Sequence, residues 1–137
     1  MDTNRKLIVT GILAGSLATL LTAYGASAQS LSPMRGKVQS FTESFAVQVF
    51  PANPYSHRIR LEMHAYDQNF RRLRNVRFTA NNFTLGAGDS RAVTAVVPFD
   101  GDKVKRVRIC TEGIPFPGQA SSNIKAQICG KFIGERR

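Results

Sequence analysis

Apolar and polar residues alternate along much of the chain after residue 28, and this period of two is typical of β-strands. The clearest example is Arg58–Tyr66, in which apolar side chains occupy every second position from Ile59 to Ala65. A segment with one apolar and one polar face is predicted to be a half-buried strand of an antiparallel sheet. The same alternation predicts further strands at Phe45–Val49, Arg74–Ala80, Arg91–Val97, Lys103–Cys110 and Asn123–Ile133.

Residues that favour turns separate the predicted strands. Clusters of Gly, Pro, Asn and Asp interrupt the alternation at Pro51–Pro54, Asp67–Asn69, Gly86–Asp89, Asp100–Asp102 and Pro115–Gly118. We interpret Asp100–Asp102 as a hairpin turn, because it carries too few oxygen ligands for a calcium loop. No stretch after residue 28 keeps the 3.6-residue apolar period of a helix. About seven short strands at this spacing predict an all-β fold, an immunoglobulin-like antiparallel β-sandwich.

The first 28 residues follow a different pattern. Arg5 and Lys6 precede an apolar run, Leu7–Leu21, and small residues follow up to Ala26–Ala28. This order is typical of a secretory signal peptide, and the run is short for a membrane span, which needs roughly 20 apolar residues. An uncleaved N-terminal anchor is the alternative. We expect a signal peptide at residues 1–28 and a single domain at 29–137, outside the cytoplasm.

The charge of the chain indicates the kind of partner. It has 19 Lys and Arg against nine Asp and Glu, a net charge of +10. Two of these basic residues and one acidic residue lie in the leader, so the remaining domain keeps a charge of +9. In an exported protein this charge favours an acidic protein surface, anionic lipid or an anionic envelope polymer, whereas the leader argues against nucleic acid.

Two clusters of basic residues are candidates for a patch that binds such a partner. The alternative is that they keep exposed strands soluble and protect their edges from aggregation. Taken together with the charge of the domain, the clusters favour a basic patch made of Arg71, Arg72, Arg74, Arg77, Lys103, Lys105, Arg106 and Arg108.

The chain has two cysteines, Cys110 and Cys129. Exported compartments are oxidising, so an even pair there favours a structural disulfide. If the last two strands form a hairpin centred between Gln119 and Ala120, the two cysteines lie opposite each other. The bridge would close a loop of about 20 residues and stabilise the final hairpin by roughly 3 kcal/mol.

Catalytic and metal-binding patterns are not found in the sequence. His57 and His64 would point to opposite faces of a strand, which makes them a poor metal pair. His64 shares a face with Glu62, and we interpret these two as a surface pair. Phosphate loops and a Gly-x-Ser-x-Gly motif are missing. We predict no enzyme, cofactor or metal; a small hydrolase or metal-dependent enzyme would need a cluster that only folding assembles.

Several short segments resemble a known family. Four segments carry this resemblance. Pro33–Arg35 begins the first strand, Phe83–Arg91 and Glu112–Pro115 lie in the middle of the domain, and Gly130–Phe132 ends the last strand. Together they resemble the N-terminal domain of periplasmic pilus chaperones, an immunoglobulin-like sandwich that assists secreted fibre subunits. Those chaperones have two such domains, and this chain ends at Arg137 where a second would begin, so we expect a single-domain relative.

The resemblance implies a site for a carboxylate. In the family, an arginine of the first strand and a lysine of the last strand bind the C-terminal carboxylate of the subunit. By position, Arg35 matches the first and Lys131 the second, with Lys125 a weaker match for the lysine. Two fixed cations bind a carboxylate strongly when they are partly desolvated. The alternative is that both are ordinary solvated strand residues.

The family also donates its last strand to complete the sheet of a subunit. Alternating apolar residues Ile124, Ala126 and Ile128 match this pattern, although they could instead face the core of this domain. We therefore expect an exported, periplasmic protein-binding module, chaperone-like or an accessory factor in the assembly of a secreted or envelope structure. The alternative is a permanent structural subunit of an envelope complex.

Overall fold

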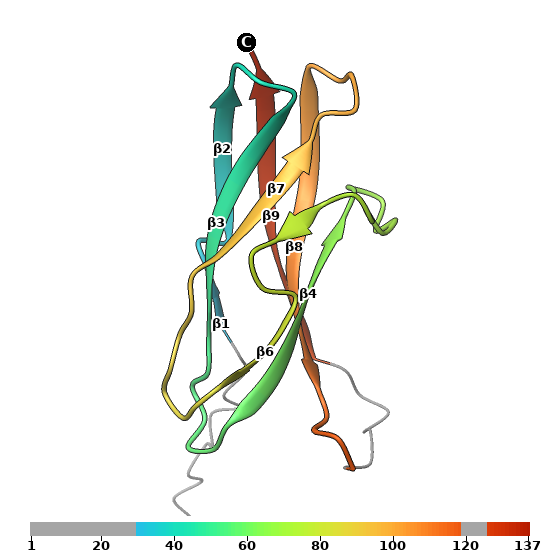
Figure 1. Ribbon diagram of the computed structural model, residues 1–137. Helices are drawn as coiled ribbons and strands as arrows, with labels where there is room; N and C mark the ends of the chain where they lie inside the picture. Colours follow the sequence, from blue (N-terminus) through green and yellow to red (C-terminus); the bar gives the residue numbers. More distant parts are fainter. Residues whose placement is uncertain (1–29, 119–125) are drawn as a thin grey trace, which may run out of the picture.

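The computed structural model describes residues 30–118 and 126–137 (Figure 1). The predicted signal peptide at residues 1–28 lies outside this part of the chain. In the described part the elements are strands, namely β1 (Ser30–Ser32), β2 (Arg35–Ser40), β3 (Ser44–Ala52), β4 (Ile59–Tyr66), β5 (Arg77–Phe78), β6 (Asn82–Leu85), β7 (Val93–Pro98), β8 (Val104–Ile114) and β9 (Gln127–Arg136).

The strands form two sheets that pack face to face. The smaller sheet has the order β1-β3-β7-β5, and the larger has the order β2-β9-β8-β4-β6. All pairs are antiparallel except β2 with β9, which run parallel. The prediction of an all-β, immunoglobulin-like sandwich is therefore confirmed, with one parallel pair that the alternation did not predict.

The core lies between the sheets and follows the alternation of the sequence. In β3, Phe45, Val47 and Val49 are buried, while the residues between them are exposed. The ring of Phe45 packs against that of Phe99, with centroids 5.0 Å apart, and Phe132 of β9 is also fully buried. Apolar burial of this kind is the main favourable term in folding.

The final hairpin is confirmed. Strands β8 and β9 pair antiparallel from Val104 with Glu135 to Glu112 with Gln127, and Cys110 lies opposite Cys129. The two cysteines form a disulfide, with Cα atoms 4.0 Å apart. The centre of the connection at residues 119–120 lies outside the described residues.

The turn at Asp100–Asp102 differs from the prediction. It connects β7 to β8, which belong to different sheets, so it crosses the sandwich and is not a hairpin turn. Both Asp100 and Gly101 have positive φ angles, 53° and 85°, which this sharp turn requires. Hydrogen bonds from Lys105 and then Asn75 hold the pKa of Asp100 below its ordinary value.

Two other strands differ from the prediction: one is shorter than expected, and one was not predicted. The strand expected at Arg74–Ala80 is reduced to β5. Thr79 still bonds to Thr94 of β7, whereas Leu73 and Asn81 on either side bond to β4. A short strand that the alternation missed, β6, pairs with β4 at the edge of the larger sheet. Four residues are too few to show a clear period of two.

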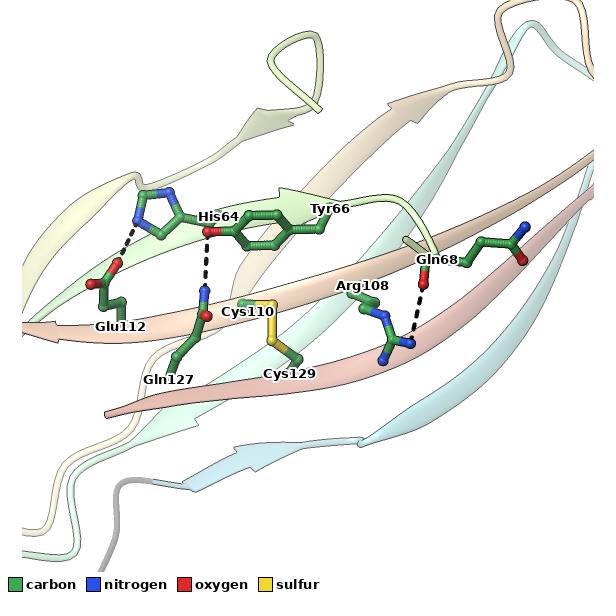
Figure 2. Close-up of a disulfide and its surroundings, with 8 residues drawn as sticks. All are labelled: His64, Tyr66, Gln68, Arg108, Cys110, Glu112, Gln127 and Cys129. Atoms are coloured by element: carbon green, nitrogen blue, oxygen red, sulfur yellow. Dashed lines mark hydrogen bonds and ion pairs between the residues drawn. A yellow bond between two sulfur atoms is a disulfide. The ribbon is translucent and has the colours of Figure 1, made fainter. Parts of the chain in front are cut away.

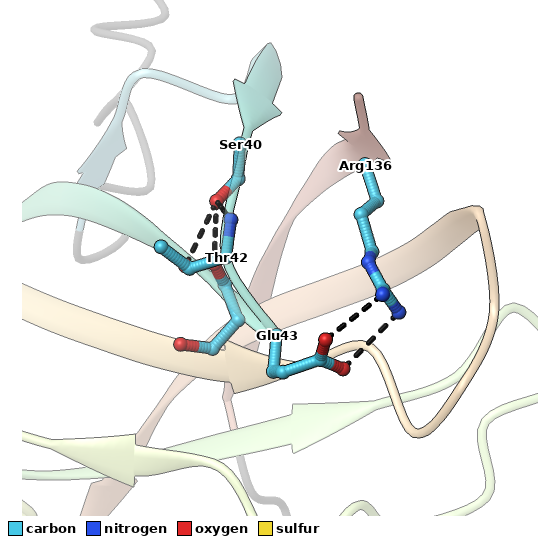
Figure 3. A network of polar contacts seen from close by, with 5 residues as sticks. Ser40, Thr42, Glu43 and Arg136 are labelled. Atoms are coloured by element: carbon cyan, nitrogen blue, oxygen red, sulfur yellow. Dashed lines mark hydrogen bonds and ion pairs between the residues drawn. The ribbon is translucent and has the colours of Figure 1, made fainter.

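The N-terminal segment contributes to both sheets. Strand β1 pairs with β3 in the smaller sheet, and after the cis Ser32–Pro33 bond the chain enters the larger sheet as β2. At the C-terminal end of β2, an ion pair connects the β2–β3 turn to the end of β9 (Figure 3). The guanidinium of Arg136 binds the Glu43 carboxylate at 2.8 and 3.1 Å, and Thr42 donates its N–H to Ser40 Oγ at 3.2 Å.

Gly134 of β9 leaves space for the ring of Phe45 in the core. A methyl group at this position would overlap that ring. We expect Gly134→Ala to lower the free energy of unfolding by about 1–3 kcal/mol, as overpacking of a filled core does. Urea denaturation measures this. Gly86→Ala is the control, because its methyl group meets only the Asp89 carboxylate, which can rotate away. Equal effects of the two changes would contradict the expectation.

Asn53 is a buried polar residue that ties three segments together. Its Nδ2 donates to the carbonyls of His57, Leu85 and Gly86 at 2.8–3.1 Å, and its Oδ1 accepts from the N–H of Tyr55. It is 1% exposed. Removal of such an amide leaves buried backbone groups unpaired, which costs about 1–3 kcal/mol for each.

We therefore expect Asn53→Ala to destabilise the fold by about 3 kcal/mol in the same denaturation assay. Asn75→Ala is the matched control, since the amide of Asn75 is exposed and bonds only to Asp100 among the residues described. That control should change stability by less than about 1 kcal/mol. A small effect of Asn53→Ala would mean that water replaces its bonds.

Candidate partner-binding site

The outer face of the larger sheet carries the candidate site. Strands β8 and β9 send Val107 and Phe132 into the core, so their neighbours Arg108 and Lys131 point to the opposite side. We call this side, which faces away from the smaller sheet, the outer face.

Arg35 and Lys131 lie side by side on this face. They are register partners in the parallel pair of β2 and β9, so their side chains share one side of the sheet. Together with Gly36 and Ile133 they line a surface hollow of about 440 Å³. In the part of the chain that the structure describes, neither cation forms an ion pair with an acidic side chain.

The neighbouring cation on β2 is already neutralised. Lys37 binds Glu135 of β9, with Nζ 2.7 Å from Oε1, and this hydrogen bond holds the pKa of Glu135 below its ordinary value. Arg35 and Lys131 therefore differ from Lys37 in that their charges remain available to an anion. Two such cations bind a carboxylate best through charge-assisted hydrogen bonds.

Arg108 extends this row of cations across the next strand. It is the register partner of Lys131, and its guanidinium stacks on Phe70, with Cζ 4.2 Å from the ring centroid. Its Nη2 also donates to the carbonyl of Gln68 at 3.4 Å (Figure 2). Asp67 shapes this loop, because its Oδ1 accepts the N–H groups of residues 69 and 71 at 2.8 and 2.9 Å.

Among the described residues, no strand pairs with one backbone edge of β9 beside the cations. Strand β2 pairs with β9 only from Lys131 onward, where the N–H of Lys131 donates to the Met34 carbonyl at 2.8 Å. Cys129 and Gln127 lie two and four residues before Lys131, so their N–H and C=O groups point to the same side of β9 as those of Lys131. No strand among the described residues pairs with them there. We call this side of Gln127–Gly130 the open edge.

The residues predicted for strand donation fall into different environments. Ile124 and Lys125 lie outside the described residues. Ala126 is exposed, whereas Ile128 is partly buried and packs against the core of this domain. Ile128 therefore fits the alternative prediction, in which the residues of this strand face the core of this domain.

The eight residues predicted as one basic patch do not share one face. Arg106 and Arg108 lie on the outer face, but Lys105 has the opposite parity on β8 and forms an ion pair with Asp100. Arg77 belongs to β5 of the smaller sheet. The exposed residues that remain, Arg71, Arg72, Arg74 and Lys103, lie in loops.

His64 also differs from its expected setting. It is 4% exposed and is therefore not part of a surface pair. Its Nε2 lies 3.1 Å from Oε2 of Glu112 and 3.6 Å from Oε2 of Glu62 (Figure 2 shows the contact with Glu112). Sequence spacing pointed to Glu62 alone, because Glu112 reaches the histidine only through the pairing of β4 with β8.

Solved structures similar to this chain include periplasmic pilus chaperones. One is the E. coli chaperone DraB, with a TM-score of 0.63 at 15% identity over 80% of this chain and 55% of the chaperone. Another is the complex of the Salmonella enterica SafA pilin with the SafB chaperone. It has a TM-score of 0.62 at 15% identity over 80% of this chain and 54% of the matched chain. The chain thus spans little more than half the length of these chains.

The same fold occurs in a shorter protein. WR4, a C. elegans MSP family member, matches with a TM-score of 0.55 at 8% identity, covering 81% of this chain and 99% of WR4. No family model matches the sequence, and no curated protein matches it either. The resemblance to an immunoglobulin-like domain of pilus chaperones is therefore confirmed for the fold.

Among the described residues, no helix is long and apolar enough to cross a membrane.

Proposed function

We propose that this chain is an exported, periplasmic protein-binding module that acts like a pilus chaperone, or as an accessory factor, in the assembly of a secreted or envelope structure. A strand of the partner would add to the open edge of β9. The C-terminal carboxylate of that strand would bind between Arg35 and Lys131. The signal-peptide pattern of residues 1–28 supports export and cleavage of the leader.

One observation carries this proposal: the open edge ends at the two cations. Strand β2 begins at Arg35 and runs parallel to β9. A partner strand that follows the same line and direction along Gln127–Gly130 would end where β2 begins, with its carboxylate at Arg35 and Lys131. Main-chain hydrogen bonds would supply affinity, and the cations would select the end of the chain.

The surrounding charges support an acidic partner. Arg106 and Arg108 lie on the same outer face as Lys131, and the domain has a large positive charge. Such a field increases the rate at which an acidic surface, or an anionic envelope polymer, approaches. Because these groups are exposed or half-buried, salt should weaken the attraction.

Capture of the partner from the envelope of the native host tests the proposal. The mature protein, residues 29–137, is compared with an Arg35→Ala, Lys131→Ala double variant. We expect the wild type to capture a secreted subunit and the double variant to bind it about 100- to 10,000-fold more weakly, since each of the two charge-assisted bonds contributes about 1.5–3 kcal/mol. Lys37→Ala is the matched control, because Lys37 is already paired with Glu135.

A synthetic peptide with the C-terminal sequence of the captured partner then isolates the carboxylate. The free acid should bind the wild type more tightly than the amide does, and the double variant should no longer distinguish them. Equal binding of acid and amide to the wild type would refute the carboxylate site. A complex of fixed stoichiometry, captured equally by wild type and double variant, would identify a permanent structural subunit instead.

A further inference from the structure

We propose that Glu62, His64 and Glu112 form a binding site for a divalent transition metal ion of the zinc type. The three side chains meet on the outer face, on the far side of the disulfide from Lys131. Glu62 and His64 are two residues apart on β4, and Glu112 is the register partner of Glu62 on β8. The backbone ladder between two neighbouring strands therefore fixes all three positions. This inference does not depend on the proposed function.

The distances between the ligand atoms suit a tetrahedral ion. Zinc lies about 2.0–2.2 Å from histidine nitrogen and carboxylate oxygen, and tetrahedral angles then separate two ligand atoms by about 3.4 Å. The Nε2 atom of His64 lies 3.1 Å from Oε2 of Glu112 and 3.6 Å from Oε2 of Glu62. All three ligand atoms lie within 4.8 Å of one another, so small side-chain adjustments place them around one ion.

The donor set also selects the class of ion. An imidazole with two carboxylates suits zinc and related transition metals, whereas magnesium and calcium prefer ligands that are all oxygen. The two carboxylates approach the same ring nitrogen, so one ion can contact all three groups. Three protein ligands leave a fourth position for water or for a group from a partner.

Burial makes this cluster more than a group of surface charges. The side chain of His64 is 4% exposed and that of Glu112 is 14% exposed, so both are held in place by their surroundings. Glu62 is 38% exposed and gives the ion access from solvent.

The second ring nitrogen limits the affinity that we expect. Nδ1 of His64 is buried and has no hydrogen-bond partner among the described residues. Most metal-bound histidines donate this N–H to a carboxylate or carbonyl, and loss of such a partner weakens metal binding about 10- to 100-fold. A site of moderate affinity is therefore expected, and calorimetry measures affinities of this order directly.

Calorimetric titration of the untagged mature protein with zinc chloride is the test. We expect one zinc ion per chain, and at least about 10-fold weaker binding by Glu62→Gln, which keeps the shape of a half-exposed side chain but removes its charge. His57→Asn is the matched control, because His57 is exposed and stacks on Tyr55 outside the cluster. Magnesium chloride in place of zinc should give no binding.

A second readout identifies the ligands. X-ray absorption at the zinc edge should show one nitrogen and two carboxylate oxygens, and His64→Asn should remove the nitrogen. If His64→Asn does not fold, Glu62→Gln decides the question, since it changes no buried group. The proposal is overturned if the wild type binds no zinc at a ratio of one, or if His57→Asn and Glu62→Gln weaken binding equally.

Discussion

Strand β9 and its register determine the arrangement of the larger sheet. It pairs with β8 along its whole length, whereas β2 pairs with it only from Lys131 onward. A shift of one residue would turn Phe132 out of the core, so burial fixes the register between β8 and β9. The disulfide between Cys110 and Cys129 holds the same register covalently. The open edge and the position of the two cations both follow from this pairing.

The disulfide also separates a row of cations from a pair of carboxylates on the outer face. Residues two apart on a strand are separated by about 7 Å, and the cysteine pair stands between a basic and an acidic row. The basic row contains Arg108, Lys131 and Arg35, and the acidic row contains Glu62 and Glu112. The candidate partner site and the proposed metal site therefore lie next to each other on this face, on either side of the cysteine pair.

The fold does not by itself assign the function. Pilus chaperones and an MSP family member share this sandwich with the chain at 15% identity or less. Function depends on the chemistry of a site, which one fold can carry in different forms. For this chain, the chaperone-like proposal combines that resemblance with the open edge and with the positions of Arg35 and Lys131.

The alternation of apolar residues by itself predicted the longer core strands β3, β4, β7, β8 and β9, because a period of two leaves each strand only one face to bury. The cysteine positions likewise determined the final hairpin, since its register brings Cys110 opposite Cys129. Only the tertiary structure decided that β2 joins β9 in parallel, that the Asp100 turn crosses between sheets, and that Glu112 reaches His64. These contacts join segments far apart in the chain, and no local period encodes which strand will lie beside another.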